Sequence, residues 1–398
     1  MGFGIKSAIK TVTASQGSAN MLLLKNADVY APEPQGICDL LIGGGEILAI
    51  QPHIEEAGLP VQPDVIDADG CPVTPGFIDN HVHIAGGGGE GGFHTRTSEL
   101  DIQSALRAGV TTLVGVLGTD GIARSMEDLL AKVYALRNAG LSAWCYTGSY
   151  HVPIRTLTES LMRDIMLIEP IIGAGEIAVS DHRSSRPSSA ELARLVADAR
   201  VAGMLSGKAG VVNFHLGDEP AGMEPLFELA ESLNYAKTVL LPTHCGRNKA
   251  LYEQAKTWAK SGGTVDFTTS SVPQFVKNGE ISASRALDEF IREGIDIAFM
   301  TWSSDGQGSL PLFDEKGQFS GLTTGTCQSL ITELKSALAL GIPLETALAP
   351  LTVNPARMLK LRRKGNLAPG SDADIVIFDR AMEPETVIAD GRVLFSPA

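Results

Sequence analysis

Paired cysteines are the first feature that this chain lacks. Its 398 residues include five cysteines that are scattered, odd in number and never spaced as Cys-x-x-Cys: Cys38, Cys71, Cys145, Cys245 and Cys327. Such a set does not make a disulfide framework and is typical of reduced thiols in a reducing compartment. We therefore expect a cytoplasmic protein and not a small disulfide-stabilised one.

The chain also lacks an excess of positive charge and a long apolar run. It has 32 Lys and Arg against 46 Asp and Glu, so its formal net charge is −14. This balance argues against the basic face needed for non-specific nucleic-acid binding, and it argues against a polybasic membrane patch. No apolar run reaches the roughly 18 residues of a membrane-spanning helix. We expect neither a nucleic acid nor a membrane as a partner.

The first 20 residues lack the features of a secretory signal peptide. They contain no uninterrupted apolar segment and no convincing cleavage site. We expect residues 1–20 to form a flexible leader, with regular structure beginning at Met21.

The chain is rich in apolar residues, and they occur in two kinds of pattern. Hydrophobic residues make up 44% of the sequence, which is enough for a large core. Both ends, residues 21–72 and 363–398, consist of short β-rich runs separated by Gly and Pro turns. The simplest interpretation is one small β-sandwich domain built from both termini. Two unrelated β flaps are the alternative.

The central residues, 73–362, alternate between strand-length apolar runs and helical segments. Eight such runs occur, at 73–83, 110–120, 141–150, 175–183, 210–218, 238–247, 263–271 and 295–306. Apolar strands that alternate with helices predict a parallel sheet buried on both faces, and eight such units predict a (β/α)8 TIM barrel of the α/β class. Periodicity alone leaves a doubly wound open sheet as the alternative. No Gly-x-Gly-x-x-Gly follows the first strand, so a dinucleotide site has little support.

Histidines and carboxylates gather in or at the ends of the predicted strands. Six candidate metal ligands are placed in this way: His81 and His83 on the first strand, Glu176 in the fourth, His215 on the fifth, His244 on the sixth and Asp305 on the eighth. The C-terminal ends of barrel strands open on one face, so these side chains should meet there. His81 and His83 are two residues apart, and on a strand both would point the same way.

These residue types indicate a centre with two metal ions. Imidazole and carboxylate ligands suit zinc and similar divalent ions, and six ligands are too many for one tetrahedral site. Paired metals lower the pKa of a bridging water and supply a hydroxide nucleophile near neutral pH. Asp305 is placed to accept the proton of that water and to pass it to a leaving amine.

Several motifs carry a resemblance to a known superfamily. The segments PGFIDNHVH (75–83), TVNPAR (352–357) and GSDADIV (370–376) resemble the hallmarks of the amidohydrolase superfamily. A closer resemblance, to the bacterial β-aspartyl (isoaspartyl) dipeptidases, rests on GGGGE (86–90), TRT (95–97), GVLGTD (115–120), TGSYHVP (147–153), SDHRS (180–184), NFHLGD (213–218), LPTHCGRN (241–248) and SSDGQGS (303–309). The resemblance runs from about Met21 to the C-terminal strands.

The resemblance implies a zinc-dependent metallopeptidase that hydrolyses isoaspartyl dipeptides, and it suggests a homo-oligomer, an octamer. His81, His83 and Asp305 would hold the more buried of two zinc ions. His215 and His244 would hold the other.

The resemblance also implies how a small dipeptide substrate would be bound. Glu90 would pair with its free α-amino group, and Arg183 and Arg247 would clamp its carboxylates, to which a guanidinium fork is suited. Tyr150 would polarise the scissile carbonyl and stabilise the developing oxyanion. Three further residues would bind the aspartyl α-carboxylate: Gly88, Thr119 and Ser309. A β-aspartyl dipeptide carries one ammonium and two carboxylates, so this set is complementary to it.

The chain departs from the resemblance at the ligand that would bridge the two zinc ions. The similar enzymes use a carboxylated lysine seven residues before the arginine of Ser-Asp-His-Arg, and that position is Glu176 here. A glutamate supplies a bridging carboxylate but is shorter, so the backbone must approach the metals more closely. One extra residue just before Glu176, with Gly173 and Gly175 around it, would permit a bulge.

Two alternatives to a bridging Glu176 stay open. Glu176 could lie beside a site that other groups hold, or one metal could be lost. Lys208 is the nearby lysine, but it precedes the fifth strand and does not lie in or after it. His151 and His182 are interpreted as supporting or structural residues, and alternation along the strand points Cys245 away from the metals.

Two other functions compete with the dipeptidase. One is a different amidohydrolase that acts on a cyclic amide or an N-acyl amino acid, although a neutral cyclic amide does not need two arginines. The other is a non-catalytic barrel used for assembly. Such a barrel should have lost its ligands, whereas this chain retains four strand-end histidines and Asp305.

Overall fold

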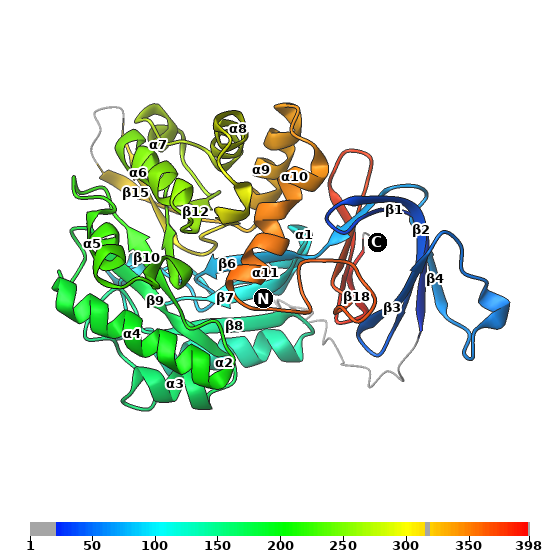
Figure 1. The fold of residues 1–398 in the computed structure, drawn as a ribbon, viewed down its shortest axis with the longest axis horizontal. Helices are drawn as coiled ribbons and strands as arrows, with labels where there is room; N and C mark the ends of the chain where they lie inside the picture. The colour runs from blue at the N-terminus through cyan, green and yellow to red at the C-terminus, as the bar shows by residue number, and fades with distance from the viewer. Residues whose placement is uncertain (1–20, 315–318, 397–398) are drawn as a thin grey trace, which may run out of the picture.

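The computed structural model describes residues 21–314 and 319–396. The predicted leader, residues 1–20, lies outside this part. Figure 1 shows two units side by side, a helix-wrapped barrel and a smaller sheet in which the blue N-terminal strands lie next to the red C-terminal ones.

The smaller unit is one eight-stranded sheet made from both ends of the chain. Its strands follow the order β18-β17-β16-β5-β1-β2-β3, with β4 also paired to β1. They are β1 Leu22–Tyr30, β2 Pro34–Gly43, β3 Glu46–Gln51, β4 Asp64–Asp67, β5 Pro72–Pro75, β16 Ile375–Phe378, β17 Pro384–Ala389 and β18 Arg392–Phe395. Leu24, Leu40 and Ile375 are completely buried in its core. The prediction of a small β-domain built from both termini is confirmed.

The larger unit contains eight parallel strands. They are β6 Phe77–Val82, β7 Val110–Gly115, β8 Ser142–Thr147, β9 Ile171–Val179, β10 Val211–Leu216, β11 Leu240–Thr243, β12 Val265–Thr268 and β13 Met300–Ser303. Strands β6 to β11 form one continuous sheet, and β12 pairs with β13. Backbone hydrogen bonds close the ring, from Cys245 N to Asp266 O at 3.1 Å and from His83 N to Gly306 O at 2.9 Å. The predicted (β/α)8 barrel is confirmed.

Helices cover the outside of the barrel (Figure 1). They are α1 Ile102–Arg107, α2 Met126–Asn138, α3 Leu161–Leu167, α4 Ser189–Ser206, α5 Glu224–Ser232, α6 Lys249–Lys260, α7 Pro273–Lys277, α8 Ala283–Glu293, α9 Gln328–Ala339, α10 Leu344–Leu348 and α11 Val353–Met358. The boundaries of α4 follow from its caps, since Ser188 and Glu191 form a capping box and Gly207 ends the helix in the left-handed conformation. Within residues 21–314 and 319–396, no helix combines the length and the apolar character of a membrane span.

Three local features differ from the predicted pattern. The strand predicted at 73–83 is two strands, because β5 pairs with β1 and β16 in the terminal sheet. The barrel therefore starts at Phe77, whereas the predicted domain began at residue 73. Strand β9 begins at Ile171, before the predicted residue 175. An unpredicted antiparallel hairpin, β14 Ser309–Phe313 with β15 Phe319–Thr324, follows the last barrel strand.

Candidate active site

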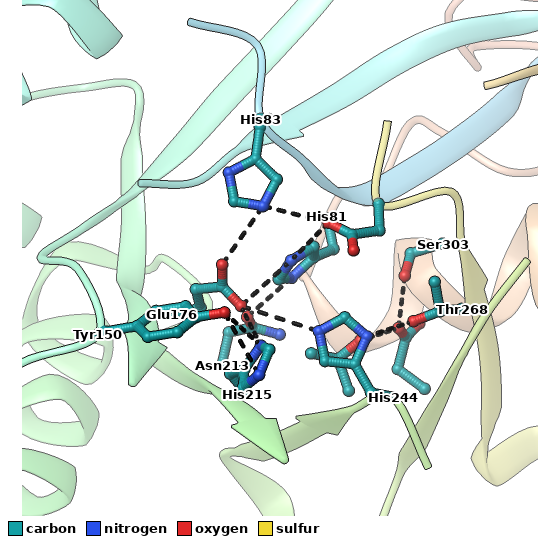
Figure 2. Close-up of polar contacts among 12 residues, drawn as sticks. His81, His83, Tyr150, Glu176, Asn213, His215, His244, Thr268 and Ser303 are labelled. Carbon is teal, nitrogen blue, oxygen red and sulfur yellow. Dashed lines mark hydrogen bonds and ion pairs between the residues drawn. The ribbon is translucent and has the colours of Figure 1, made fainter. Parts of the chain in front are cut away.

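The six predicted metal ligands come together at the C-terminal ends of the barrel strands. All six are buried. Five of them form two groups that share one carboxylate, and within each group the ligand atoms lie within 4.8 Å of one another: His81, His83 and Glu176, and Glu176, His215 and His244. Figure 2 shows the four imidazoles arranged around Glu176.

Both oxygens of Glu176 face histidine nitrogens. Its Oε1 lies 3.4 Å from His83 Nε2. Its Oε2 lies 3.1 Å from His215 Nδ1, 3.4 Å from His81 Nε2 and 4.0 Å from His244 Nε2. Burial alone would raise the pKa of Glu176, but the surrounding imidazoles outweigh burial and lower the pKa to about 2. Glu176 is therefore an ionised carboxylate at the centre of the cluster.

Asp305 completes the cluster on the β6 side. Its Oδ1 lies 3.1 Å from His83 Nε2 and 3.7 Å from His81 Nε2. Among the residues that the structure describes, three of the buried ligand atoms have no hydrogen bond of acceptable geometry, namely His81 Nε2, Glu176 Oε1 and Asp305 Oδ1. Leaving a buried polar atom unpaired costs about 1–3 kcal/mol, and a cation would remove that cost. The donor set therefore fits two divalent metal ions of the zinc type.

A bulge in β9 positions Glu176. The pairing with β10 shifts by one residue here, so that Gly175 and Glu176 together stand opposite Asn213. Gly175 has a φ of 145°, and a Cβ at this residue would lie only 2.9 Å from the backbone oxygen of Asn213. Only glycine tolerates this conformation and this close approach. The bulge that the sequence predicted at this place is therefore present in β9.

Neighbouring polar groups orient two of the histidines. His81 Nδ1 lies 3.0 Å from Asn213 Oδ1, and His244 Nδ1 lies 2.6 Å from Thr268 Oγ1. Both rings thus turn their Nε2 atoms towards Glu176 (Figure 2). Hydrogen bonds to the second ring nitrogen commonly fix metal-binding histidines in this way.

A buried carboxylate holds four strands together beneath the cluster. Asp266, on β12, accepts hydrogen bonds from Asn80 at 3.1 Å, Thr243 at 2.7 Å, Thr301 at 2.6 Å and Ser303 at 2.5 Å. These donors belong to β6, β11 and β13, three of the strands that carry or precede the candidate ligands. The network sets the relative positions of these strand ends.

A cavity of about 680 Å³ opens above the cluster. It is lined by every predicted site residue except His81, which lies beneath the surface: Gly88, Glu90, Thr119, Tyr150, Arg183, Arg247 and Ser309, together with the metal-ligand candidates His83, Glu176, His215, His244 and Asp305. The β14–β15 hairpin contributes an apolar wall through Leu310, Pro311 and Leu322. The structure therefore brings the predicted metal and substrate residues into one pocket.

Glu90 is the centre of the polar contacts in this pocket. Thr119 Oγ1 donates to its Oε1 and Ser309 Oγ donates to its Oε2, both at 3.1 Å. Arg183 Nη1 lies 3.4 Å from Oε1. Gly88, in the same loop, has a φ of 71°, and a Cβ there would lie 2.7 Å from a backbone oxygen of Thr95. The loop thus carries backbone groups and a carboxylate close to the cluster.

Tyr150 is buried beside the candidate metal ligand His215. Its hydroxyl lies 2.9 Å from His215 Nδ1. Burial, and next the charge of Glu176, raise the pKa of Tyr150 well above its usual range. The phenol therefore keeps its proton at neutral pH and can act as a hydrogen-bond donor.

Sequence reasoning missed two charged residues of the site. Asp181, within the Ser-Asp-His-Arg motif, is 1% exposed and bonds both Arg183 and His215. Arg124 is buried below the loop that carries Glu90 and donates to the carbonyls of Gly87 and Thr97 at 3.1 and 2.7 Å. The sequence offered one sign that Asp181 belongs to the site, its position two residues before Arg183. It offered no such sign for Arg124.

The remaining candidates lie outside the cluster. The ammonium of Lys208 donates to the carbonyls of Ile165, Ile168 and Ile171, so it is not a ligand. His151 Nε2 lies 3.2 Å from the carbonyl of Arg183. His182 is exposed at the pocket rim, and Cys245 is a buried, unpaired thiol.

Comparison with known proteins agrees with the family resemblance that the sequence motifs indicated. Residues 73–274 and 276–394 match the model of the Amidohydrolase family. The chain is also similar to a β-aspartyl dipeptidase from Fervidobacterium islandicum AW-1, solved in complex with a β-Asp-Leu dipeptide. The two chains are 45% identical with a TM-score of 0.89, and the match covers 96% of this chain and 97% of that one. The resemblance inferred from the motifs is confirmed.

More distant relatives carry other names. A dihydroorotase of Pelotomaculum thermopropionicum is 26% identical in an alignment of 418 positions that covers 93% of this chain and 92% of that protein. An L-hydantoinase of Arthrobacter aurescens is 18% identical with a TM-score of 0.64, covering 95% of this chain and 96% of the other. The likeness to the hydantoinase shows a shared fold alone.

Proposed function

The chain belongs to the amidohydrolase family, and on this basis we propose that it hydrolyses β-aspartyl (isoaspartyl) dipeptides with two bound zinc ions. The observation that carries the proposal is the charge pattern of the pocket. The charged side chains that line the cavity beside the candidate metal cluster include the carboxylate of Glu90 and the guanidinium groups of Arg183 and Arg247. A β-aspartyl dipeptide presents one ammonium and two carboxylates around its amide, and the 45% identical structure holds such a dipeptide.

Two divalent ions fit the cluster. In our proposal His81, His83 and Asp305 would hold one ion and His215 and His244 the other, and Glu176 would supply the shared carboxylate in place of a carboxylated lysine. When bound, such ions lower the pKa of water and polarise a carbonyl. The remaining work falls to the side chains around them.

Binding of the aspartyl part depends on the contacts of Glu90. In our proposal the substrate ammonium pairs with Glu90, and Thr119, Ser309 and the backbone at Gly88 then bind the neighbouring α-carboxylate. The present hydrogen bonds of Thr119 and Ser309 to Glu90, both 3.1 Å, support this arrangement. An α-ammonium and an α-carboxylate share one carbon, so their partners must be adjacent, as these three side chains are.

Asp305 and Tyr150 act on the reacting atoms in this proposal. Asp305 accepts the proton of the attacking water and delivers it to the leaving amine. The Tyr150 hydroxyl, which burial keeps protonated, donates to the carbonyl oxygen as negative charge develops there. The carboxylate of the leaving residue pairs with an arginine.

A substrate panel tests the function. The chain, reconstituted with zinc, is incubated with β-Asp-Leu, α-Asp-Leu, dihydroorotate and N-acetyl-leucine, and the products are separated by chromatography. We expect aspartate and leucine from β-Asp-Leu and little action on the other compounds. Intact β-Asp-Leu at high enzyme concentration would end the proposal, and turnover of dihydroorotate would favour the cyclic-amide alternative.

Two broader expectations accompany the function. All five cysteines are buried and unpaired, which supports a protein of a reducing compartment such as the cytoplasm. The octamer implied by the resemblance stays a prediction that sedimentation analysis would test.

A further inference from the structure

Asp181 joins the candidate metal centre to the candidate substrate clamp. It follows the end of β9, is almost completely buried and lines the cavity. Its two oxygens contact two different functional side chains, Arg183 and His215. No other role in the proposed reaction accounts for a buried charge at this place.

The first contact fixes the direction of Arg183. The backbone N and the Nε of Arg183 both donate to Asp181 Oδ1, at 2.8 and 2.9 Å, and Nη2 donates to Oδ2 at 2.8 Å. This two-pronged pairing holds the guanidinium plane in one orientation. The guanidinium also lies 5.1 Å from the centre of the Tyr150 ring. The Nη1 edge is left facing Glu90 at the place where substrate would bind.

The second contact fixes the ring of His215. Its Nε2 lies 3.1 Å from Asp181 Oδ2, while its Nδ1 faces Glu176 at 3.1 Å (Figure 2). His215 therefore presents Nδ1 to the cluster, whereas His81 and His244 present Nε2 and bond neutral oxygens with Nδ1. Because the carboxylate of Asp181 accepts a hydrogen bond from Nε2 of His215, the ring proton lies on Nε2 and Nδ1 is free to bind a metal.

We propose that Asp181 is a positioning residue that holds His215 for metal binding and Arg183 for substrate binding at the same time. The part of the proposal that concerns Arg183 rests on the proposed dipeptidase function. The part that concerns His215 requires only that the cluster binds a metal ion. Loss of the Asp181 charge should therefore weaken two measurable events, zinc binding and substrate binding.

The test compares Asp181→Asn with Asp164→Asn. The amide of Asp181→Asn can still accept at one atom but places a donor opposite Arg183 and His215. Asp164 is a matched control, because it is also buried and accepts bonds from Thr147, Leu157 and Thr158 away from the site. Metal-free protein is titrated with Zn²⁺ against a coloured chelator, and KM and kcat are measured with β-Asp-Leu.

For Asp181→Asn we expect the affinity of the weaker zinc site to fall by about 10- to 100-fold. We expect KM to rise by roughly tenfold or more. Asp164→Asn should lower only the melting temperature. In an Arg183→Met background, Asp181→Asn should no longer raise KM but should still weaken zinc binding.

Zinc affinity and KM both equal to wild type in Asp181→Asn would overturn the proposal. So would an equal rise in KM with Arg183 already removed. If the variant does not fold, the proposal is tested on the wild-type protein with zinc bound. Its ¹H–¹⁵N spectra should show His215 protonated at Nε2, and His81 and His244 protonated at Nδ1. An Nδ1–H tautomer of His215 contradicts the assignment. Wild-type protein that spares β-Asp-Leu would refute the function but leave the zinc and tautomer measurements valid.

Discussion

At the scale of single residues, the proposed reaction depends most directly on Asp305. Its carboxylate is buried between His81 and His83 and also lines the cavity. We predict that Asp305→Asn lowers kcat for β-Asp-Leu by about 10²- to 10⁴-fold, because the amide cannot accept and return a proton. Zinc content and the melting temperature, measured on the same samples, separate this effect from loss of metal or fold.

Asp288→Asn is the control for Asp305→Asn. Asp288 pairs with Arg292 on the surface of α8, and such a pair contributes little to stability. This variant should keep the wild-type kcat. A wild-type rate in Asp305→Asn would show that the proton passes through another group.

The Tyr150 hydroxyl is the second residue that a single substitution can test. Tyr150→Phe keeps the ring beside Arg183 and removes only the donor. We predict a fall in kcat of roughly 10²- to 10³-fold with KM nearly unchanged, because the hydroxyl acts on charge that develops during the reaction. A raised KM with an unchanged kcat would instead show that Tyr150 binds the ground state.

The residues that could be predicted from sequence are those whose spacing reveals their place. His81 and His83 alternate along one strand, and the other candidate ligands follow apolar runs. Arg124 could not be found in this way, and the spacing of Asp181 from Arg183 could not reveal its second partner, because these contacts involve distant parts of the chain. Asp181 meets His215 on the next strand, and Arg124 bonds the carbonyl of Thr97 across a loop.

At the scale of secondary structure elements, the bulge in β9 is the feature that allows a glutamate to reach the cluster. We predict that Gly175→Ala displaces Glu176 and Asn213, since the new Cβ would lie 2.9 Å from the Asn213 backbone oxygen. Overpacking of this kind costs about 1–3 kcal/mol. Zinc bound per chain should fall below that of wild type, as measured by atomic emission after gel filtration.

Gly207→Ala, at the end of α4, is the matched control for Gly175→Ala. Gly207 also has a positive φ, 72°, but a Cβ there meets nothing within 4 Å. It should lose some stability through backbone strain and keep all its zinc. If both variants lose stability and neither loses zinc, the bulge is not what places Glu176.

Arg124 adds side-chain hydrogen bonds to the backbone hydrogen bonds of the loop after β6. The guanidinium donates to the carbonyls of Ala85, Gly87 and Thr97, so it keeps Glu90 near Thr119 and Ser309. We predict that Arg124→Met raises KM several-fold and leaves zinc binding unchanged. Arg285→Met, an exposed change on α8, should alter neither quantity, and a lower zinc content in Arg124→Met would contradict the assignment.

The positions of strands and helices were predictable because apolar spacing governs both. The division of the segment 73–83 was not, because β5 owes its place to β16, which lies about 300 residues later in the chain. The β14–β15 hairpin was missed as well, and in the part of the chain that the structure describes its strands pair with each other and not with the barrel.

At the scale of the whole molecule, bound metal ions should increase the stability of the folded barrel. The six candidate ligands are carried by or follow five strands: β6, β9, β10, β11 and β13. A ligand that binds only the folded state adds about 4 kcal/mol of stability at a thousandfold excess over its dissociation constant. For a domain of this size each kcal/mol corresponds to roughly 2–4 °C.

We therefore predict that removal of metal by a chelator lowers the melting temperature by roughly 10 °C, and that added Zn²⁺ restores it. Mg²⁺ at the same concentration should have little effect, because it prefers oxygen ligands and this cluster is rich in imidazole. Glu176→Gln, which removes the shared charge, should lose most of the zinc-dependent gain. Equal melting temperatures with and without zinc would show that the cluster does not bind metal in the folded protein. If wild type responds to zinc and Glu176→Gln does not, the carboxylate of Glu176 is the group that both metal sites require.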